Sequence, residues 1–405
     1  MLREQAPLRD DVPLAFEADA QSDGHHVEDK GSASFCIPRR AVEILLDNGA
    51  SALEICAYLV LACHTDASGR CSTASVTAIY RATGANKTKG GTIDRALARL
   101  LTMRCLRGRV ESGQQPAAVA EQLLVTREQW LDGGGGVLPD GPGARAQVRY
   151  ILNDFGEALA ERVWFGSALV AGLAGFRQPL RVLKDAGDVA ARLLLSLYAA
   201  NDMETWGGVR PIGGGCGPAM RFQTVATGSI KGAEILTARR EQWVATVDDR
   251  ICAADAGSYW AALDALMASG FAYEVVVALN RAPVPRALSN GQTYEAIPED
   301  AEPLYVLDTR SLHGFKPRGE EGLSGTTALI AGGTGYSVAN GNGRFCGTYA
   351  AIVRPGFKTM VTGIVRLRFR VSNPRNFGVA DAWRRIRSST AETKEFLERV
   401  IALNS

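Results

Sequence analysis

Apolar side chains recur with a helical period along residues 52–63, and Gly69 stops the pattern. A shorter run of the same kind covers residues 75–83 and closes at Gly84. Residues 92–106 predict a further helix after a polar turn. The first run places its apolar side chains at Leu53, Ile55, Cys56, Leu59, Val60 and Cys63. Three consecutive helices are therefore expected, with a tight turn before the last.

Two segments after these helices have the composition of strands. Residues 106–112 (LRGRVES) and 120–126 (AEQLLVT) can pair as a hairpin, with Gln114, Gln115 and Pro116 in the loop between them. Upstream, residues 33–49 predict a short strand, a proline break and a helix. Helices and strands thus mix along one segment, which indicates an α+β fold.

The helix that begins at Thr92 has two contrasting faces. At about 100° per residue, one side carries apolar side chains and the opposite side carries polar and basic ones. A helix of this kind can pack one stripe into a core and place the other in a DNA major groove, whose width admits an α-helix. The apolar side is Ile93, Ala96, Leu97, Leu100 and Leu101, and the polar side is Thr92, Arg95, Arg99 and Thr102.

Positive charge gathers around this helix. Between Asn86 and Arg109 the chain carries seven Lys and Arg residues and one acid, Asp94, a balance that favours contact with phosphate. Lys87, Thr88 and Lys89 lie where the turn meets the helix N-terminus, a position that suits phosphate oxygens. Arg95 and Arg99 are candidates for bidentate bonds to guanine. The candidate DNA-binding residues are Lys87, Thr88, Lys89, Thr92, Arg95, Arg99, Arg107 and Arg109, the last two contacting the backbone or the minor groove.

The motif SVTAIYRATG…TIDRALARLLTMRCLRG resembles the winged helix-turn-helix family of bacterial regulators and of replication initiators from plasmids, phages and integrative elements. The preceding FCIPRRAVEILLDNG resembles the lead-in of the replication-type members. The resemblance covers about 90 residues and implies a DNA-binding winged helix. The turn ANKTKGG is longer than the family pattern, which leaves the start of the reading helix open, and Cys105 stands where a glycine is usual.

Composition divides the chain into five segments. Residues 1–33 are an acidic tail with the composition of disorder, and residues 34–131 are the predicted winged-helix DNA-binding domain. Residues 132–144 are rich in Gly and Pro and predict a linker or a mobile loop. Residues 145–318 predict a second winged-helix-like domain, because a helix followed by two strands returns there. Residues 319–405 contain a Gly-rich segment and a basic C-terminal strand and helix.

The basic C-terminal part is a second candidate surface. Arg366, Arg368 and Arg370 alternate within the predicted strand 360–371 and would share one face. A terminal amphipathic helix is expected over residues 379–403. This face would either bind nucleic acid or protect a solvated edge strand through its charge.

Other chemistry finds little support in the sequence. The chain has 405 residues, 46% of them apolar, a net charge of +2 and eight scattered cysteines that form no C-x-x-C pair. Cys63, His64 and Cys71 lack a second ligand pair for a metal. No catalytic constellation and no phosphate loop is found, so we expect neither an enzyme nor a cofactor or metal. No secretory signal and no stretch of about 20 apolar residues is present, so a cytoplasmic protein without a membrane partner is expected.

Three functions fit these features. The first is a sequence-specific protein that binds double-stranded DNA and initiates replication of a mobile genetic element, with two winged-helix units on repeated sites. The second is a transcription regulator in which residues 150–405 sense a partner or form a homodimer. The third is an adaptor whose winged helices bind protein. A separate alternative for Arg95 and Arg99 is that they only solvate a helix face. The replication or transcription machinery would be a further partner of the first two.

Overall fold

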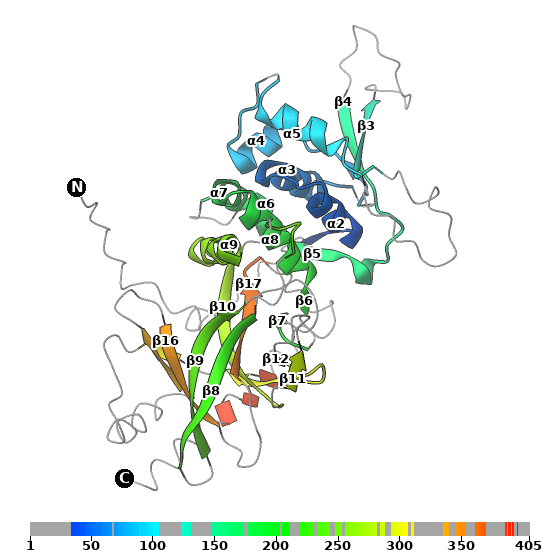
Figure 1. The fold of residues 1–405 in the computed structure, drawn as a ribbon. Helices are drawn as coiled ribbons and strands as arrows, with labels where there is room; N and C mark the ends of the chain where they lie inside the picture. Colours follow the sequence, from blue (N-terminus) through cyan, green and yellow to red (C-terminus); the bar gives the residue numbers. More distant parts are fainter. Residues whose placement is uncertain are drawn as a thin grey trace, which may run out of the picture. The chain divides into compact units, whose positions relative to one another are not determined.

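The computed structural model describes a large part of the chain after the first 33 residues. Within that part the fold is mixed α+β, as the sequence predicts, with α-helices and mostly antiparallel sheets (Figure 1). The described residues are 34–66, 69–88, 90–104, 123–130, 147–172, 177–202, 205–210, 219–230, 233–243, 248–252, 256–281, 284–287, 293–306, 309–311, 335–339, 345–352 and 361–369, together with 385, 386, 388, 389, 391, 392 and 395.

The described part begins with strand β1 (Ser34–Ile37), which leads through Pro38 into helix α2 (Arg39–Asp47). Helix α3 (Ala52–Cys63) follows, and both helices occur where the sequence predicts them. The Ser51 side chain accepts from the Glu54 N–H, while Glu54 accepts from the Ser51 N–H, so a capping box starts α3. Helix α3 is buried on nearly every side, which makes it the centre of the N-terminal core.

Five elements follow in an order of strand, two helices and two strands. They are β2 (Cys71–Ser72), α4 (Val76–Thr83), α5 (Thr92–Leu100), β3 (Val125–Trp130) and β4 (Gln147–Leu152). The strands form one antiparallel sheet in the order β2-β4-β3, so the last strand lies between the other two. Helix α3 contacts both α4 and α5.

The sheet contains a hairpin that the sequence did not predict. Strand β3 pairs with β4 over six residues, from Val125–Leu152 to Trp130–Gln147, and an antiparallel bridge joins Leu123, just before β3, to Arg104. Residues 106–112, half of the expected hairpin, lie outside the described residues. Residues 132–144 therefore come between two adjacent strands of one sheet, at a place where the sequence suggested a linker or a mobile loop.

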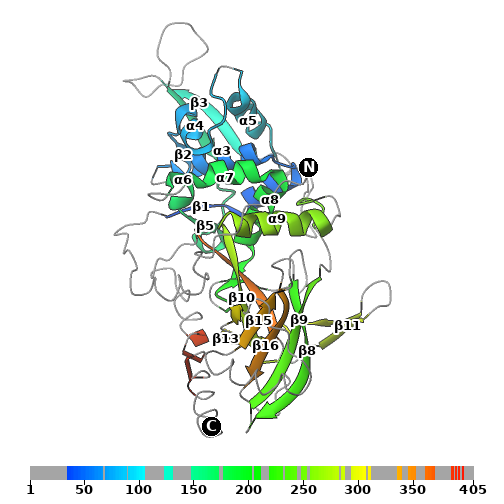
Figure 2. The same ribbon diagram turned by 90° about the vertical axis from the view of Figure 1, so that its left-hand side faces the viewer.

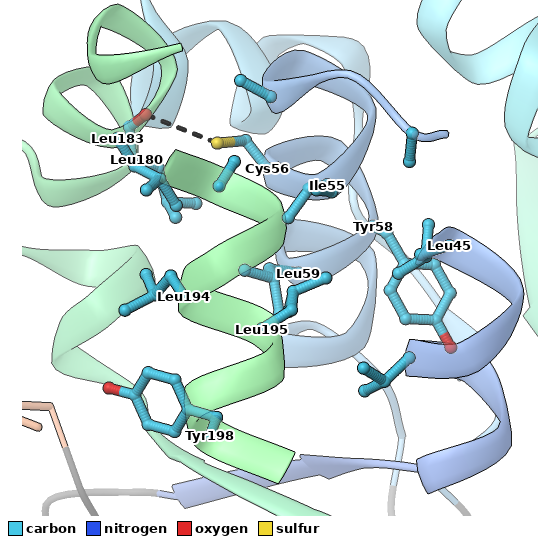
Figure 3. Close-up of a cluster of buried hydrophobic side chains, with 14 of the residues drawn as sticks. Leu45, Ile55, Cys56, Tyr58, Leu59, Leu180, Leu183, Leu194, Leu195 and Tyr198 are labelled. Atoms are coloured by element: carbon cyan, nitrogen blue, oxygen red, sulfur yellow. Dashed lines mark hydrogen bonds between the residues drawn. The ribbon is translucent and has the colours of Figure 1, made fainter. Parts of the chain in front are cut away.

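Four further helices surround or extend the core around α3. Helix α6 (Ala168–Ala171), helix α7 (Pro179–Ala186) and helix α8 (Asp188–Ala199) follow strand β5 (Val163–Gly166), and α9 (Ala256–Ala268) comes later in the chain. Helix α3 contacts α6, α7 and α8. Figure 3 shows how the buried leucines of α7 and α8 face the apolar side chains of α2 and α3. The Cys56 thiol at this contact donates to the Leu180 carbonyl at 3.4 Å.

Most of the remaining strands belong to one large mixed sheet. Its main path runs β13-β10-β17-β8-β9-β16-β15-β14, and β6 and β7 branch from it. Figure 2 shows its longest strands, β8 and β9, running side by side. A separate hairpin contains β11 (Val284–Ala287) and β12 (Thr293–Ala296). The large sheet contains β6 (Asn201–Asp202), β7 (Gly208–Val209), β8 (Ala219–Ile230), β9 (Ala233–Trp243), β10 (Ala272–Leu279), β13 (Pro303–Val306), β14 (Thr309–Ser311), β15 (Gly335–Ala339), β16 (Phe345–Ile352) and β17 (Val361–Leu367).

The strands of residues 145–318 are divided between several sheets. Strand β4 joins the sheet of β2 and β3, while β5 pairs with β1 at the start of the described chain. Strands β10 and β13 both follow helix α9, as expected, and they pair with each other. On its other side β10 pairs with β17 from the C-terminal part over seven residues, so this sheet also includes a strand from outside residues 145–318.

The basic strand near the C-terminus is present, but it is neither an exposed surface nor an edge. Strand β17 lies between β10 and β8, and Arg366 on it is 2% exposed. The Arg366 guanidinium lies over the Tyr273 ring, and its Nε donates to the Gly207 carbonyl at 2.9 Å. Arg368 is exposed just beyond the strand, and Arg370 lies outside the described residues. The alternation of arginines therefore does not predict one shared basic face.

The predicted terminal helix is described only in part. The seven positions described between 385 and 395 are all helical, with Ile386 buried and Arg385 exposed. Ser388 donates to the Glu392 carboxylate four residues later, as helix geometry allows. In the described segments, no helix is both long and apolar enough to cross a membrane.

Candidate nucleic-acid interface

Helix α5 has the two faces that its sequence predicts. Ile93, Ala96, Leu97 and Leu100 are buried, whereas Arg95, Ala98 and Arg99 are exposed. The buried side chains recur every three or four residues and meet α3 and α4. Thr92 is half-buried at the helix start, and Thr102 is exposed just beyond its end. The basic side chains of α5 are thus directed away from the core.

Glycines and short polar side chains order the turn between α4 and α5. Helix α4 ends at Gly84, whose φ of 65° is the left-handed conformation that glycine adopts without strain. The Asn86 side chain accepts from both the N–H and the hydroxyl of Thr88, and the Asn86 N–H donates to Thr92 Oγ1. Both threonine hydroxyls therefore contribute to the turn itself. They are less available to a ligand than the sequence suggests.

The single acid of this region is also committed to the turn. Asp94 Oδ2 accepts from the Gly90 N–H at 2.8 Å, just before the helix. A carboxylate at a helix N-terminus is stabilised by the helix dipole. Asp94 therefore has a structural function at this position, and it neutralises none of the arginine side chains through a described ion pair.

The cations expected to bind DNA differ in their solvent exposure and in their contacts. Lys87 is exposed, and its ammonium lies 4.7 Å from the centre of the Tyr80 ring. Arg95 is exposed, and its guanidinium forms no hydrogen bond or ion pair with any described residue. Lys89, Arg107 and Arg109 lie outside the described residues. Among the expected base contacts, Arg95 is therefore the side chain whose donors remain available.

Arg99 differs from Arg95, although both lie on the outer side of α5. Its Nε lies 3.3 Å from Glu54 Oε1, and its Nη2 donates to the Asn48 carbonyl at 2.9 Å. Its side chain is 54% exposed, but Glu54 is nearly buried at 9%. Arg99 thus connects the end of α5 to the junction of α2 and α3, and only part of its guanidinium remains open to a ligand.

Two further cations lie near this surface and were missed in the sequence. Arg81 is exposed on α4, and Arg127 is exposed on β3 directly across from Tyr150. Burial raises the pKa of the Tyr150 phenol, the charge of Arg127 lowers it, and the charge of Asp94 raises it. Arg127 and the first turn of α5 therefore lie close to the same ring. The strand pattern VTREQW could have revealed Arg127, but the expected strand ended at Thr126.

The arrangement of exposed cations can bind an anionic surface. No cluster of His, Cys, Asp or Glu that could hold a metal occurs among them. Burial raises the pKa of the Cys56 thiol to about 12, which suits a core side chain and not a nucleophile. The chain matches no known protein family, no curated protein and no solved structure.

Proposed function

We propose that residues 52–152 form a winged helix that binds double-stranded DNA, with α5 in the major groove. The order helix, strand, helix, helix, strand, strand supports this assignment, together with the sheet order β2-β4-β3. The observation that carries the proposal is the exposed, unpaired Arg95 at the middle of a short helix whose other side is fixed in the core. A helix held in this way can present a guanidinium to base edges.

The cations around Arg95 have different proposed tasks. Arg95 reads a base, because arginine can donate two hydrogen bonds to guanine O6 and N7. Lys87, Arg81 and Arg127 are exposed around the helix and contact phosphates, which position the protein without reading sequence. Arg99 orients α5 through Glu54 and Asn48 and contributes less to the DNA contact than the sequence suggests.

The biological role of this DNA binding is a separate proposal. The sequence resemblance favours an initiator of replication for a mobile genetic element, and a transcription regulator is the second candidate. The regulator gains from one observation. Strand β10 pairs with β17 as well as with β13, so residues 145–318 do not supply all the strands of their own sheet, as an independent second DNA-binding unit would. A protein-binding adaptor is the third.

Selection of bound fragments from the host genome, followed by footprinting, tests the function. We expect a defined site whose binding weakens with salt, and an Arg95→Ala variant should lose about ten- to a hundredfold in affinity, the cost of one bidentate contact of about 1–3 kcal/mol. Arg281→Ala is the control, because Arg281 is exposed and pairs with Asp300 in a different part of the fold.

The selected sites also separate the roles. Repeated sites at an origin would support initiation, whereas one palindrome at the protein's own promoter would support regulation. If the folded protein binds no duplex at any salt concentration, the DNA-binding proposal is wrong and the adaptor takes its place.

A further inference from the structure

Helix α7 presents a basic surface that the sequence did not single out. Arg177, Arg181 and Lys184 surround one acid, Asp185. Arg177 Nη2 lies 2.9 Å from Asp185 Oδ2, and Lys184 Nζ lies 2.8 Å from Asp185 Oδ1. The hydrogen bond from Lys184 lowers the pKa of Asp185, and the charges of Lys184, Arg177 and Arg181 act in the same direction. Three cations and one anion leave this surface, which we call the α7 basic surface, with an excess positive charge.

Arg181 joins this surface to the turn before α5. Its guanidinium lies against Gly84: a Cβ built on that glycine would lie 2.2 Å from Arg181 Nη2 and 2.6 Å from Arg181 Cζ. The left-handed Gly84 thus leaves the space that the guanidinium occupies. Helix α7 also contacts α4, and Figure 2 shows the two helices next to each other. The α7 basic surface therefore continues into the turn that carries Lys87.

The guanidinium of Arg181 has N–H groups that are available to a ligand. Arg181 is exposed, and its guanidinium forms no hydrogen bond or ion pair with any residue in the described part of the chain. Asp185 is exposed too, so its pairs with Arg177 and Lys184 are held only weakly in water. A phosphate could take over these contacts at small cost, because charge-assisted bonds from arginine to phosphate are strong.

We propose that the α7 basic surface contacts the phosphate backbone of the same DNA duplex, beside the segment that α5 reads. This inference rests on the proposed function and extends the interface to a helix outside residues 52–152. Arg181 contacts the backbone nearest the α4–α5 turn, and Arg177 and Lys184 extend the contact along α7. Such contacts add affinity and lengthen the footprint without adding base preference.

The salt dependence of binding tests this proposal. Affinity is measured by fluorescence anisotropy over a series of salt concentrations, using the full chain and its selected site. We expect Arg177→Gln/Arg181→Gln/Lys184→Gln to lower the slope of log affinity against log salt by about two to three units, close to one for each phosphate that the variant no longer binds. Its preference for the selected site over a scrambled duplex should not change.

Three companion variants keep the result interpretable. Arg177→Gln/Lys184→Gln leaves Arg181 at Gly84, so the turn remains undisturbed, and it should lower the slope by about one to two units. Asp185→Asn removes the acid and should strengthen binding. Arg281→Gln removes an exposed charge elsewhere and should leave the slope unchanged.

The outcomes distinguish this inference from the proposed function. If the wild-type protein binds its site and both α7 variants keep its slope and footprint, the inference is wrong and the α7 basic surface suits an acidic protein partner instead. If the α7 variants lose sequence preference together with affinity, α7 reads bases and the backbone assignment is wrong. A wild-type protein that binds no duplex would overturn both proposals. If Arg95→Ala loses binding and the α7 variants bind like wild type, the proposed DNA reading by α5 stands and the proposed contact of the α7 basic surface is refuted.

Discussion

Arg99 Nε lies 3.3 Å from Glu54 Oε1, and this ion pair joins the last turn of α5 to the first turn of α3. The same carboxylate also caps α3 by accepting from the Ser51 N–H at 2.7 Å. One nearly buried glutamate therefore fixes the start of the core helix and the end of the proposed recognition helix.

A Glu54→Gln variant tests this double role. Glutamine can still accept from Ser51 but loses the charge that attracts Arg99, so we expect the free energy of unfolding to fall by about 1 kcal/mol. DNA affinity should fall several-fold with little change in its salt dependence, since no phosphate contact is removed. Urea unfolding and anisotropy measure the two effects. Glu43→Gln is the control, because Glu43 also pairs with an arginine, Arg40, but its side chain is 42% exposed.

The carboxylate of Glu157 caps helix α2 from a distant part of the chain. Its two oxygens accept from the Arg39 and Arg40 N–H groups, each at 2.7 Å. Glu157→Ala should lower the free energy of unfolding by about 1–2 kcal/mol, the usual cost of removing an N-terminal cap. Chemical denaturation checks this, with Glu161→Ala as the exposed neighbour whose loss should change little. Equal stability of the two variants would show that the cap contributes nothing.

Arg366 should act on stability and not on DNA binding. Arg366→Ala removes a buried side chain from the middle of the sheet and leaves the Gly207 carbonyl without its 2.9 Å donor, so we expect a loss of about 2–4 kcal/mol. The folded fraction should bind DNA with the wild-type salt slope. Arg368→Ala, at an exposed position, should cost less than about 0.5 kcal/mol. A stable Arg366→Ala protein with a weaker salt slope would instead place Arg366 on the DNA surface.

The Cys56 thiol should make the protein less stable in alkali. Its pKa is raised from 9.0 to about 12 by burial, so between these values the unfolded chain releases a proton that the folded chain keeps. The contribution of the Cys56 thiol to the free energy of unfolding is therefore fully present below pH 9 and declines as the pH rises toward 12. Thermal unfolding of wild type and Cys56→Ala is measured between pH 8 and about pH 10.5. The stability advantage of the wild type over Cys56→Ala should narrow as the pH rises, because only the wild type has this thiol. A difference that stays constant would contradict this assignment.

The same residue offers a chemical check near neutral pH. Cys56 is fully buried and its thiol is protonated, so it should not react with a thiol reagent until the protein unfolds. The half-buried Cys36, Cys63 and Cys71 should react before it. Mass spectrometry of the native, alkylated protein would identify the modified positions.

Local patterns along the chain were sufficient for the helices of the candidate site. The spacing of Ile93, Ala96, Leu97 and Leu100 predicted which side of α5 is buried, because neighbours on a helix face lie three or four residues apart in sequence. The sequence also predicted the end of α4 at Gly84, since the left-handed conformation that ends a helix favours glycine. The outward position of Arg95 follows from the same spacing.

Pairings between distant residues were decided only by the tertiary structure. The sequence placed Arg99 and Arg366 among exposed cations, but Glu54 engages the first and the β10–β17 pairing buries the second. The sequence likewise could not predict that β3 pairs with β4 across a Gly-rich segment, because the residue pattern of a strand does not specify its partner strand. The sequence alone determined which residues favour a helix and which side of it is apolar. Which charges remain in water depends on long-range packing, and only the folded chain establishes that packing.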